Sequence, residues 1–206
     1  MWECSRDLSE YLTNEVNGST STIATMLRCH ADSISVSELG CGRALPSISL
    51  LSALDTIGFR GKINLMLQDL GADTIDSVTR PSVEEGISRL SADFRSRVFI
   101  DFVADAWAYM EIPPNSFHIV LSSECIYRED LFDPHASIIN RMLRGDGLAI
   151  LAAKRYYFGC GGGTIEFTEY LNKVFSDLQV DLESTFENGM SNTREIISIR
   201  RRESLS

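Results

Sequence analysis

The sequence predicts an α/β fold in which a seven-stranded mixed sheet has helices on both faces and ends in an antiparallel hairpin. Five short apolar runs alternate with segments whose apolar residues recur at helical spacing. A glycine turn joins the first of these runs to its helix, as happens at the carboxyl edge of a parallel sheet. Two more strand-like runs follow the last helix, in the order that gives a terminal hairpin.

The expected strands are short and regularly interrupted by turn residues. They lie near 34–39, 63–67, 98–102, 117–121 and 148–153, with a closing hairpin over 180–186 and 195–200. The hairpin turn is expected at Asn188-Gly189. A helical segment over residues 1–32 precedes the first strand and is expected to pack on the sheet.

Helix boundaries are predicted from capping residues. We expect Pro81 to stop a helix that begins at Ala72, and Ser82 to cap the next one. Asp133-Pro134 is expected to begin another helix, with the aspartate as N-cap and the proline at the first helical position. Gly145 is expected to end that helix.

Length and composition indicate one globular domain over residues 1–206. The chain is 44% hydrophobic and 23% charged, it lacks an apolar run long enough for a bilayer, and it does not begin with a signal-peptide pattern. Five scattered cysteines without a C-x-x-C pair argue against a disulfide framework or a zinc site. A reducing compartment, the cytoplasm or the nucleus, is therefore expected.

The formal net charge of −10 disfavours direct binding to nucleic acid, which requires basic surface. The same charge suits a basic protein partner, although solubility alone explains it better. We expect no membrane contact and no metal site, and nothing in the sequence requires more than a monomer. The three histidines, His30, His118 and His135, form no spaced metal or triad pattern and are interpreted as structural or surface residues.

The glycine turn after the first strand is the most informative single motif. Gly40 and Gly42 permit unusual backbone dihedrals and close approach of a ligand. A dinucleotide site would place a third glycine where this chain has Leu45, which disfavours a nicotinamide-dependent dehydrogenase. An ordinary strand–helix turn remains the alternative. The glycine-rich run at 159–163 lacks the lysine of a phosphate-binding P-loop.

Acidic residues follow two of the strands. Asp69, at the end of the second strand, is placed either to bind two ribose hydroxyls or to cap the next helix. Glu124 and Tyr127 follow the fourth strand three positions apart, so on a turn they would face the same way.

The ordered set of motifs is more specific than any one of them. It comprises Trp-Glu-Cys-Ser-x-Asp-Leu at 2–8, the turn Glu38–Ala44, Gln68-Asp69, Thr79-Arg80-Pro81, Trp107, Ser123–Tyr127 and Ala153-Lys154-x-x-Tyr157-Phe158-Gly159-x-Gly-Gly-Gly. Over nearly the whole chain this set resembles the histidine protein methyltransferases of the seven-β-strand, Rossmann-like class. The resemblance implies S-adenosylmethionine (SAM) as cofactor, S-adenosylhomocysteine (SAH) as product, and a histidine of a large-subunit ribosomal protein as acceptor.

The resemblance also implies residue roles. Tyr157, Phe158 and Gly161 would contact the protein substrate. The implied cofactor-binding residues are Trp2, Glu3, Cys4 and Ser5 as a wall, Glu38, Gly40 and Gly42 near the methionine, Gln68, Asp69 and Leu70 at the ribose, Asp105, Ala106 and Trp107 at the adenine, and Ser123 at the floor. The chain departs from the family pattern at Ala44, which replaces a glycine, and at Asp105-Ala106, which replace Gly-Glu.

A histidine acceptor has a pKa of about 6.5, so at neutral pH it needs the right tautomer rather than a strong base. We assign Glu124 to accept a hydrogen bond from the ring nitrogen that does not attack, and Tyr127 to form an aromatic wall for the developing cation, together with Tyr157. The alternative for Glu124 is a helix cap. Two other functions stay open: a lysine methyltransferase on the same scaffold, and a non-catalytic SAM- or SAH-binding module that chaperones a ribosomal protein.

Overall fold

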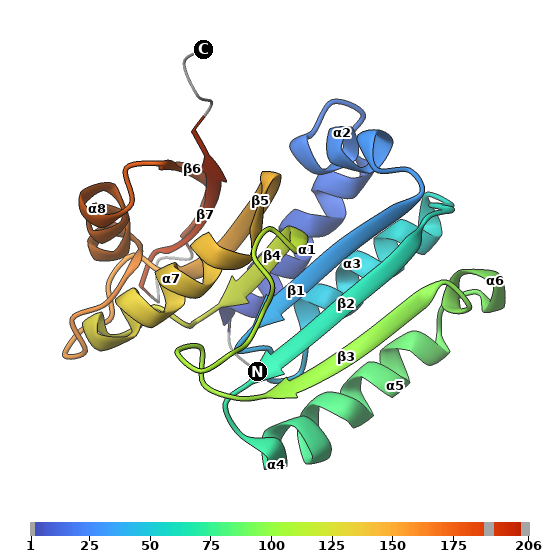
Figure 1. The fold of residues 1–206 in the computed structure, drawn as a ribbon, viewed down its shortest axis with the longest axis horizontal. Helices are drawn as coiled ribbons and strands as arrows, with labels where there is room; N and C mark the ends of the chain where they lie inside the picture. The colour runs from blue at the N-terminus through green and yellow to red at the C-terminus, as the bar shows by residue number, and fades with distance from the viewer. Residues whose placement is uncertain (1–2, 188–191, 203–206) are drawn as a thin grey trace.

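The computed structural model describes residues 3–187 and 192–202, in which seven strands form one mixed sheet (Figure 1). The strands are β1 (Ser33–Leu39), β2 (Lys62–Asp69), β3 (Val98–Ala104), β4 (Phe117–Ser123), β5 (Leu143–Lys154), β6 (Leu178–Phe186) and β7 (Arg194–Arg201). Their order is β3-β2-β1-β4-β5-β7-β6. The first five are parallel, and β7 lies antiparallel between β5 and β6. The predicted fold class is confirmed.

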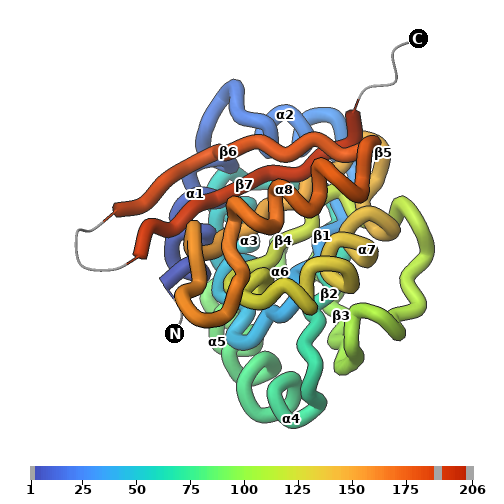
Figure 2. Tube along the Cα trace, turned by 90° about the vertical axis from the view of Figure 1, so that its left-hand side faces the viewer, coloured from blue at the N-terminus to red at the C-terminus, as the bar shows by residue number. Residues whose placement is uncertain are grey.

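Helices cover both faces of the sheet and bury two apolar cores. The longer ones are α1 (Glu3–Asn17), α2 (Thr22–Cys29), α3 (Leu45–Thr56), α5 (Arg80–Ser88), α7 (Phe132–Met142) and α8 (Thr164–Val174); α4 (Ala72–Thr74) and α6 (Ala92–Arg95) are short. One core joins α1, α3 and α5 to the back of the sheet as drawn in Figure 1, and the other lies under α7 and α8. Figure 2 shows the β6–β7 hairpin running alongside α8. No helix in the described ranges is long and apolar enough to cross a membrane.

The front of β1, β2 and β3 has no helix over it in Figure 1. The connection from β3 to β4, residues 105–116, consists of turns and irregular backbone. Polar residues accordingly alternate with buried ones here: Asn64 and Asp101 are exposed, whereas Ile63 and Leu65 are buried. This alternation is the pattern of a sheet with one solvated face.

The prediction that Pro81 stops a helix is wrong. The backbone passes from α4 through a π-helical turn (Ile75–Thr79) directly into α5, with Pro81 near the start of α5. The Arg80 N–H bonds to the carbonyl of Ile75, five residues back, and this wider turn accommodates the proline ring without breaking the helix. Ser82 therefore lies inside α5 and caps nothing; its hydroxyl donates to the carbonyl of Arg43 over 2.8 Å.

The boundaries predicted around the fifth strand are also wrong. A 3₁₀ turn (Glu129–Leu131) leads into α7 at Phe132, so Asp133 is not the N-cap and Pro134 is not the first helical residue. The Asp133 carboxylate instead accepts a hydrogen bond from the Tyr170 hydroxyl over 2.8 Å. The helix ends at Met142, and β5 begins at once because buried Leu143 pairs with Phe117 of β4; Gly145 lies inside the strand.

Residues 1–32 were predicted to form a helical segment packed on the sheet. Within the described part of that segment, α1 packs against α3 and β5, and α2 packs against α1. Leu8 and Leu12, four positions apart on one face of α1, are fully buried. Trp2 and the turn expected at Asn188-Gly189 lie outside the described residues.

Candidate active site

A cavity of about 490 Å³ opens at the carboxyl ends of β1, β2, β4 and β5. In parallel α/β sheets this edge is where ligands bind, and the volume is that of a site for one small molecule. Strand direction explains why residues far apart in sequence meet here, since each parallel strand ends at this edge. The lining residues are Ser5, Gly40, Cys41, Gly42, Arg43, Leu45, Asp69, Ser123, Glu124, Cys125, Tyr127, Lys154 and Tyr157.

The glycine turn forms one wall of the cavity, and both glycines need their conformational freedom. Gly40 has φ +60° and Gly42 has φ +47°. A methyl group at position 40 would collide with the sulfur of Cys125, whereas one at position 42 would meet nothing within 4 Å. Gly42 therefore borders open space that a ligand can occupy.

The N–H groups of this turn are already bound within the chain. The Gly40 N–H donates to the side chain of Gln68 over 3.0 Å, the Cys41 N–H to its carbonyl over 2.8 Å, and the Gly42 N–H to Asp69 Oδ2 over 2.9 Å. A pyrophosphate needs such donors free at the start of a helix. The geometry therefore agrees with the sequence in disfavouring a dinucleotide.

Glu38, predicted near a cofactor ammonium, does not line the cavity. It is 1% exposed, and its Oε2 accepts hydrogen bonds from the Ser47 N–H and hydroxyl in the first turn of α3. Burial raises the pKa of this carboxyl to about 7; the two Ser47 hydrogen bonds lower the pKa, and the Asp69 charge raises it. Its Oε1 is buried without a partner. A contact of Glu38 with the methionine part of the cofactor stays a prediction.

The three residues predicted at the ribose occupy three different environments. Asp69 lines the cavity, and its Oδ1 accepts the N–H of Leu70 over 2.8 Å. Leu70 is 71% exposed. Gln68 is buried; its Oε1 also accepts the Trp107 indole N–H over 2.8 Å, and its amide donates to the carbonyl of Asp105 over 2.7 Å. Gln68 thus links the ends of β1, β2 and β3.

The residues predicted at the adenine lie beside the cavity rather than in its lining. Trp107 packs its ring 4.6 Å from that of buried His135. The carboxylate of Asp105 accepts the N–H of Ala106, its own neighbour, over 2.8 Å. Their adenine contact stays a prediction.

The start of α1 supplies one lining residue. The Ser5 hydroxyl is hydrogen-bonded to that of Ser123 at 2.9 Å, which joins α1 to the end of β4. Cys4 is fully buried, and its thiol pKa is raised by burial and by the neighbouring Glu124. Glu3 lies outside the cavity, 3.8 Å from the guanidinium of Arg194.

Glu124 has the most unusual environment in the site. Its backbone is left-handed, with φ +59°, which costs a non-glycine residue about 1 kcal/mol or more. Its Oε2 accepts a hydrogen bond from the Tyr157 hydroxyl, and its Oε1 is buried without a partner. Burial and the Glu124 charge together raise the pKa of Tyr157 above its usual range. Glu124 caps no helix, because irregular backbone follows it and the N-cap of the next 3₁₀ turn is Arg128.

Aromatic residues stand next to this carboxylate. Tyr127 and Tyr157 both line the cavity and meet edge to face with ring centroids 6.3 Å apart. The two predicted substrate contacts next to them lie outside the lining: Phe158 is 86% exposed, and Gly161 pairs with Arg128 in an isolated bridge. Their substrate role stays a prediction.

Sequence reasoning missed five lining residues. Cys41, Arg43 and Leu45 lie in and after the glycine turn, Cys125 follows Glu124, and Lys154 ends β5. Their position in the chain could have identified them. Each lies at the end of a strand whose carboxyl end forms the site, or in the segment that leads from such a strand to the next element. Burial raises the pKa of the Cys125 thiol to about 12, so this thiol is a poor nucleophile at neutral pH.

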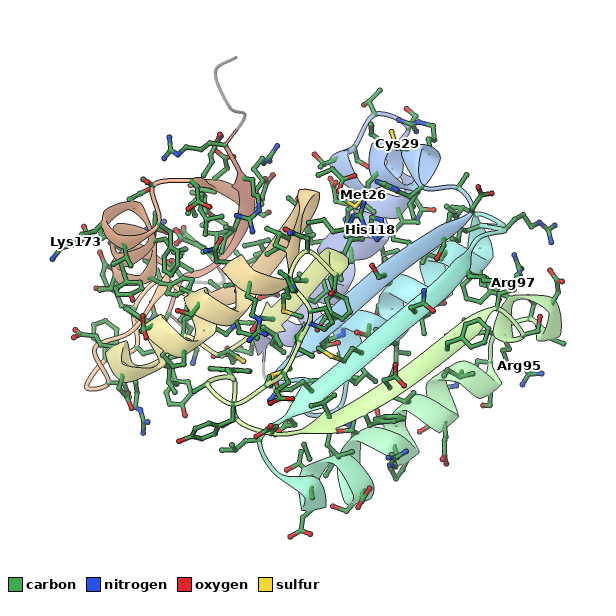
Figure 3. All side chains as sticks on the ribbon, in the orientation of Figure 1. Met26, Cys29, Arg95, Arg97, His118 and Lys173 are labelled. Atoms are coloured by element: carbon green, nitrogen blue, oxygen red, sulfur yellow. The ribbon has the colours of Figure 1, made fainter. Side chains whose placement is uncertain are left out.

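None of the three histidines, all within the described residues, lines the cavity. His118 lies near Met26 and Cys29 at the other end of the sheet (Figure 3), where its Nδ1 accepts the Ser35 N–H over 3.0 Å. His135 is fully buried, which lowers its pKa to about 3, and its Nε2 contacts the Ser122 hydroxyl at 3.0 Å. Among the described residues no His, Cys, Asp and Glu side chains form a group that could hold a metal ion.

Comparison with known proteins supports the resemblance drawn from the motifs. No family model matches the chain. The histidine protein methyltransferase 1 homolog of Dictyostelium discoideum is 28% identical over 97% of this chain and 56% of its own length. Histidine protein methyltransferase 1 of Saccharomyces cerevisiae is 27% identical over 96% of this chain and 63% of its own length. The chain thus spans about half the length of the curated relatives that it matches.

Solved structures share the fold at low sequence identity. The DszA carbon methyltransferase superposes with a TM-score of 0.61 at 13% identity, covering 87% of this chain and 51% of that one. The plantazolicin methyltransferase, solved in complex with SAH, has a TM-score of 0.59 at 9% identity, covering 95% of this chain and 85% of that one. This arrangement of sheet and helices is therefore one that methyltransferases use.

Proposed function

We propose that this chain is the catalytic domain of a SAM-dependent methyltransferase that modifies a histidine nitrogen of a protein substrate. The observation that carries the proposal is the carboxylate of Glu124. One oxygen is held by Tyr157, while the other is buried beside the cavity without a partner. The similarity to curated histidine protein methyltransferases supports the same assignment.

The residues of the cavity suit SAM, which carries a methyl group on a sulfonium that an attacking nitrogen can displace. The volume of about 490 Å³ is in the range for a ligand of this size. Asp69 ends β2, where an acid is placed to bind ribose hydroxyls, and Gly42 leaves open space beside it. Asp69 and Glu124 favour a ligand that carries positive charge.

Glu124 then orients the acceptor. In this role Oε1, which is buried without a partner here, becomes exposed to the acceptor and accepts the N–H of a neutral imidazole, which leaves the lone pair of the other ring nitrogen free for attack. The same carboxylate stabilises the imidazolium as its charge develops. Tyr127 offers an aromatic face to that cation. Positioning the acceptor nitrogen in line with the methyl group supplies the rest of the rate enhancement.

A lysine methyltransferase is the first alternative. Lysine has a pKa of about 10.4 and must lose a proton before it attacks, so its rate would climb steeply with pH. Histidine methylation would level off above neutrality. The second alternative, a non-catalytic module that binds SAM or SAH and chaperones a ribosomal protein, predicts cofactor binding without turnover.

The acceptor that we propose is a basic protein, in particular one of the large ribosomal subunit. The net charge of −10 supports a basic partner, because opposite charges speed association. This partner places the proposed activity in the cytoplasm or the nucleus.

The test has two steps. SAM and SAH are first titrated separately into the purified chain by calorimetry, with micromolar affinity expected. The chain is then incubated with methyl-labelled SAM and large-subunit ribosomal proteins, and the modified residue is located by mass spectrometry. A methylhistidine supports the proposal, and a methyllysine would replace it with the first alternative. Binding without any transfer would favour the chaperone.

A further inference from the structure

Lys154 is a cavity residue to which no role has been assigned. It is the last residue of β5 and lines the cavity next to Tyr157. Its backbone N–H donates to the Tyr157 hydroxyl over 3.2 Å, and that hydroxyl in turn donates to Glu124. Its ammonium stands 5.7 Å from the centroid of the Tyr157 ring. No carboxylate in the described parts of the chain lies within 4.0 Å of this nitrogen.

The proposed cofactor has one anionic group, the α-carboxylate of its methionine, and most backbone N–H groups of the glycine turn are already bound within the chain. The N–H groups of residues 40, 41 and 42 are bound to the end of β2. At the start of α3, Pro46 has no N–H, and the Ser47 N–H is held by Glu38. With most of these backbone donors taken, a cationic side chain is the stronger partner for a carboxylate in the cavity.

Only two cationic side chains line the cavity among the described residues, Arg43 and Lys154. Arg43 follows Gly42, whose N–H is bound to Asp69, the acid proposed to bind the ribose. Lys154 is linked through the Tyr157 hydroxyl to Glu124, where the methyl group would be transferred. Because the methionine extends from the sulfonium away from the nucleoside, its carboxylate falls nearer Lys154.

We propose that the ammonium of Lys154 binds the α-carboxylate of SAM, an inference that rests on the cofactor named in the proposed function. The charge balance of the cavity fits a singly charged carboxylate better than a phosphate, since Asp69 and Glu124 line the same space. An ion pair of this kind is a charge-assisted hydrogen bond, which contributes to affinity in a partly enclosed site.

Decarboxylated SAM is the probe that isolates this contact, because it lacks the carboxylate and keeps the sulfonium, the ammonium and the nucleoside. Both ligands are titrated calorimetrically into the unmodified chain, Lys154→Met and Arg43→Met. We expect the unmodified chain to prefer SAM by about tenfold. Lys154→Met is expected to bind the two ligands equally. Arg43→Met also removes one cavity cation, but it is expected to keep the preference for SAM. Lys154→Arg is expected to keep most of it.

The hydrogen bond from position 154 to Tyr157 comes from the backbone, so these substitutions leave it in place; melting curves check the fold. An unchanged preference in Lys154→Met, or its loss in Arg43→Met alone, would overturn the inference and leave the cofactor assignment standing. Failure of the unmodified chain to bind either ligand would overturn both.

Discussion

The hydroxyl of Tyr157 donates a hydrogen bond to Glu124 across 33 residues of sequence, and this bond fixes the acceptor end of the cavity. It occupies Oε2 of the carboxylate, while Oε1 is buried without a partner. The left-handed backbone at Glu124, φ +59°, brings the side chain to this place at the end of β4. Strained residues of this kind persist where surrounding structure holds them, often at functional sites.

Replacing Glu124 by Gln tests its proposed role in orienting the imidazole. The amide keeps the size of the side chain but removes the charge that stabilises the developing imidazolium. We expect the rate of histidine methylation to fall about a hundredfold or more, with SAM affinity within about threefold of the unmodified chain. Single-turnover methylation and calorimetry measure the two quantities. Full activity at unchanged SAM affinity would remove Glu124 from the mechanism.

Asp69→Ala tests the ribose end of the cavity. The variant loses the carboxylate that is placed to bind two hydroxyls, and with it the acceptor for the Gly42 N–H. We expect SAM affinity to fall by at least about tenfold, equivalent to about 1.4 kcal/mol. Asp69→Asn retains an oxygen acceptor for the turn and serves as the control for loss of turn geometry. Equal affinity in all three chains would exclude a ribose contact.

Two substitutions in the glycine turn separate folding from binding. Gly40→Ala introduces a methyl group that collides with the Cys125 sulfur, so we expect a stability loss of about 2 kcal/mol or more. Gly42→Ala meets no protein atom within 4 Å, so we expect only the backbone cost, about 1 kcal/mol, together with weaker SAM binding.

Chemical denaturation and calorimetry measure both effects. The double variant Gly40→Ala, Cys125→Ala is the matched control, because removal of the sulfur should restore the steric part of the loss. If stability does not recover there, the collision is not the cause. SAM affinity in Gly42→Ala equal to that of the unmodified chain would show that no ligand approaches this turn.

The raised pKa of Glu38 predicts a pH dependence of stability in the ligand-free protein. Burial raises this pKa from 4.5 to about 7, so the folded protein holds the proton more tightly than the unfolded chain. The stabilising contribution is therefore present in full below pH 4.5 and is lost as pH rises through 7. The shift corresponds to roughly 3 kcal/mol.

Denaturation of the unmodified chain and Glu38→Gln across pH 4.5 to 8 tests this, because other titrating groups cancel in the difference. The advantage of the unmodified chain should decline by roughly 3 kcal/mol across this range. A constant difference would mean that the Glu38 carboxyl titrates alike in the folded and unfolded chain.

The sequence by itself determined the architecture of the sheet and the place of the site. Apolar periodicity is a local property, so the strands, the main helices and the glycine turn were predictable, and parallel strands necessarily gather their carboxyl ends at one edge. That reasoning found Gly42, Asp69 and Glu124. It failed at Pro81 and Asp133, where a π-turn and a tertiary hydrogen bond override local capping preferences.

The direction of each side chain at that edge was decided only by the tertiary structure. Adjacent residues of a strand point to opposite faces, and neighbouring elements select their hydrogen-bond partners. The Glu38 carboxylate therefore accepts a hydrogen bond from the Ser47 N–H at the start of α3. The Gln68 side-chain oxygen accepts the N–H groups of Gly40 and Trp107. Lys154 reaches the cavity because β5 lies beside β4, a contact between strands that no local pattern specifies.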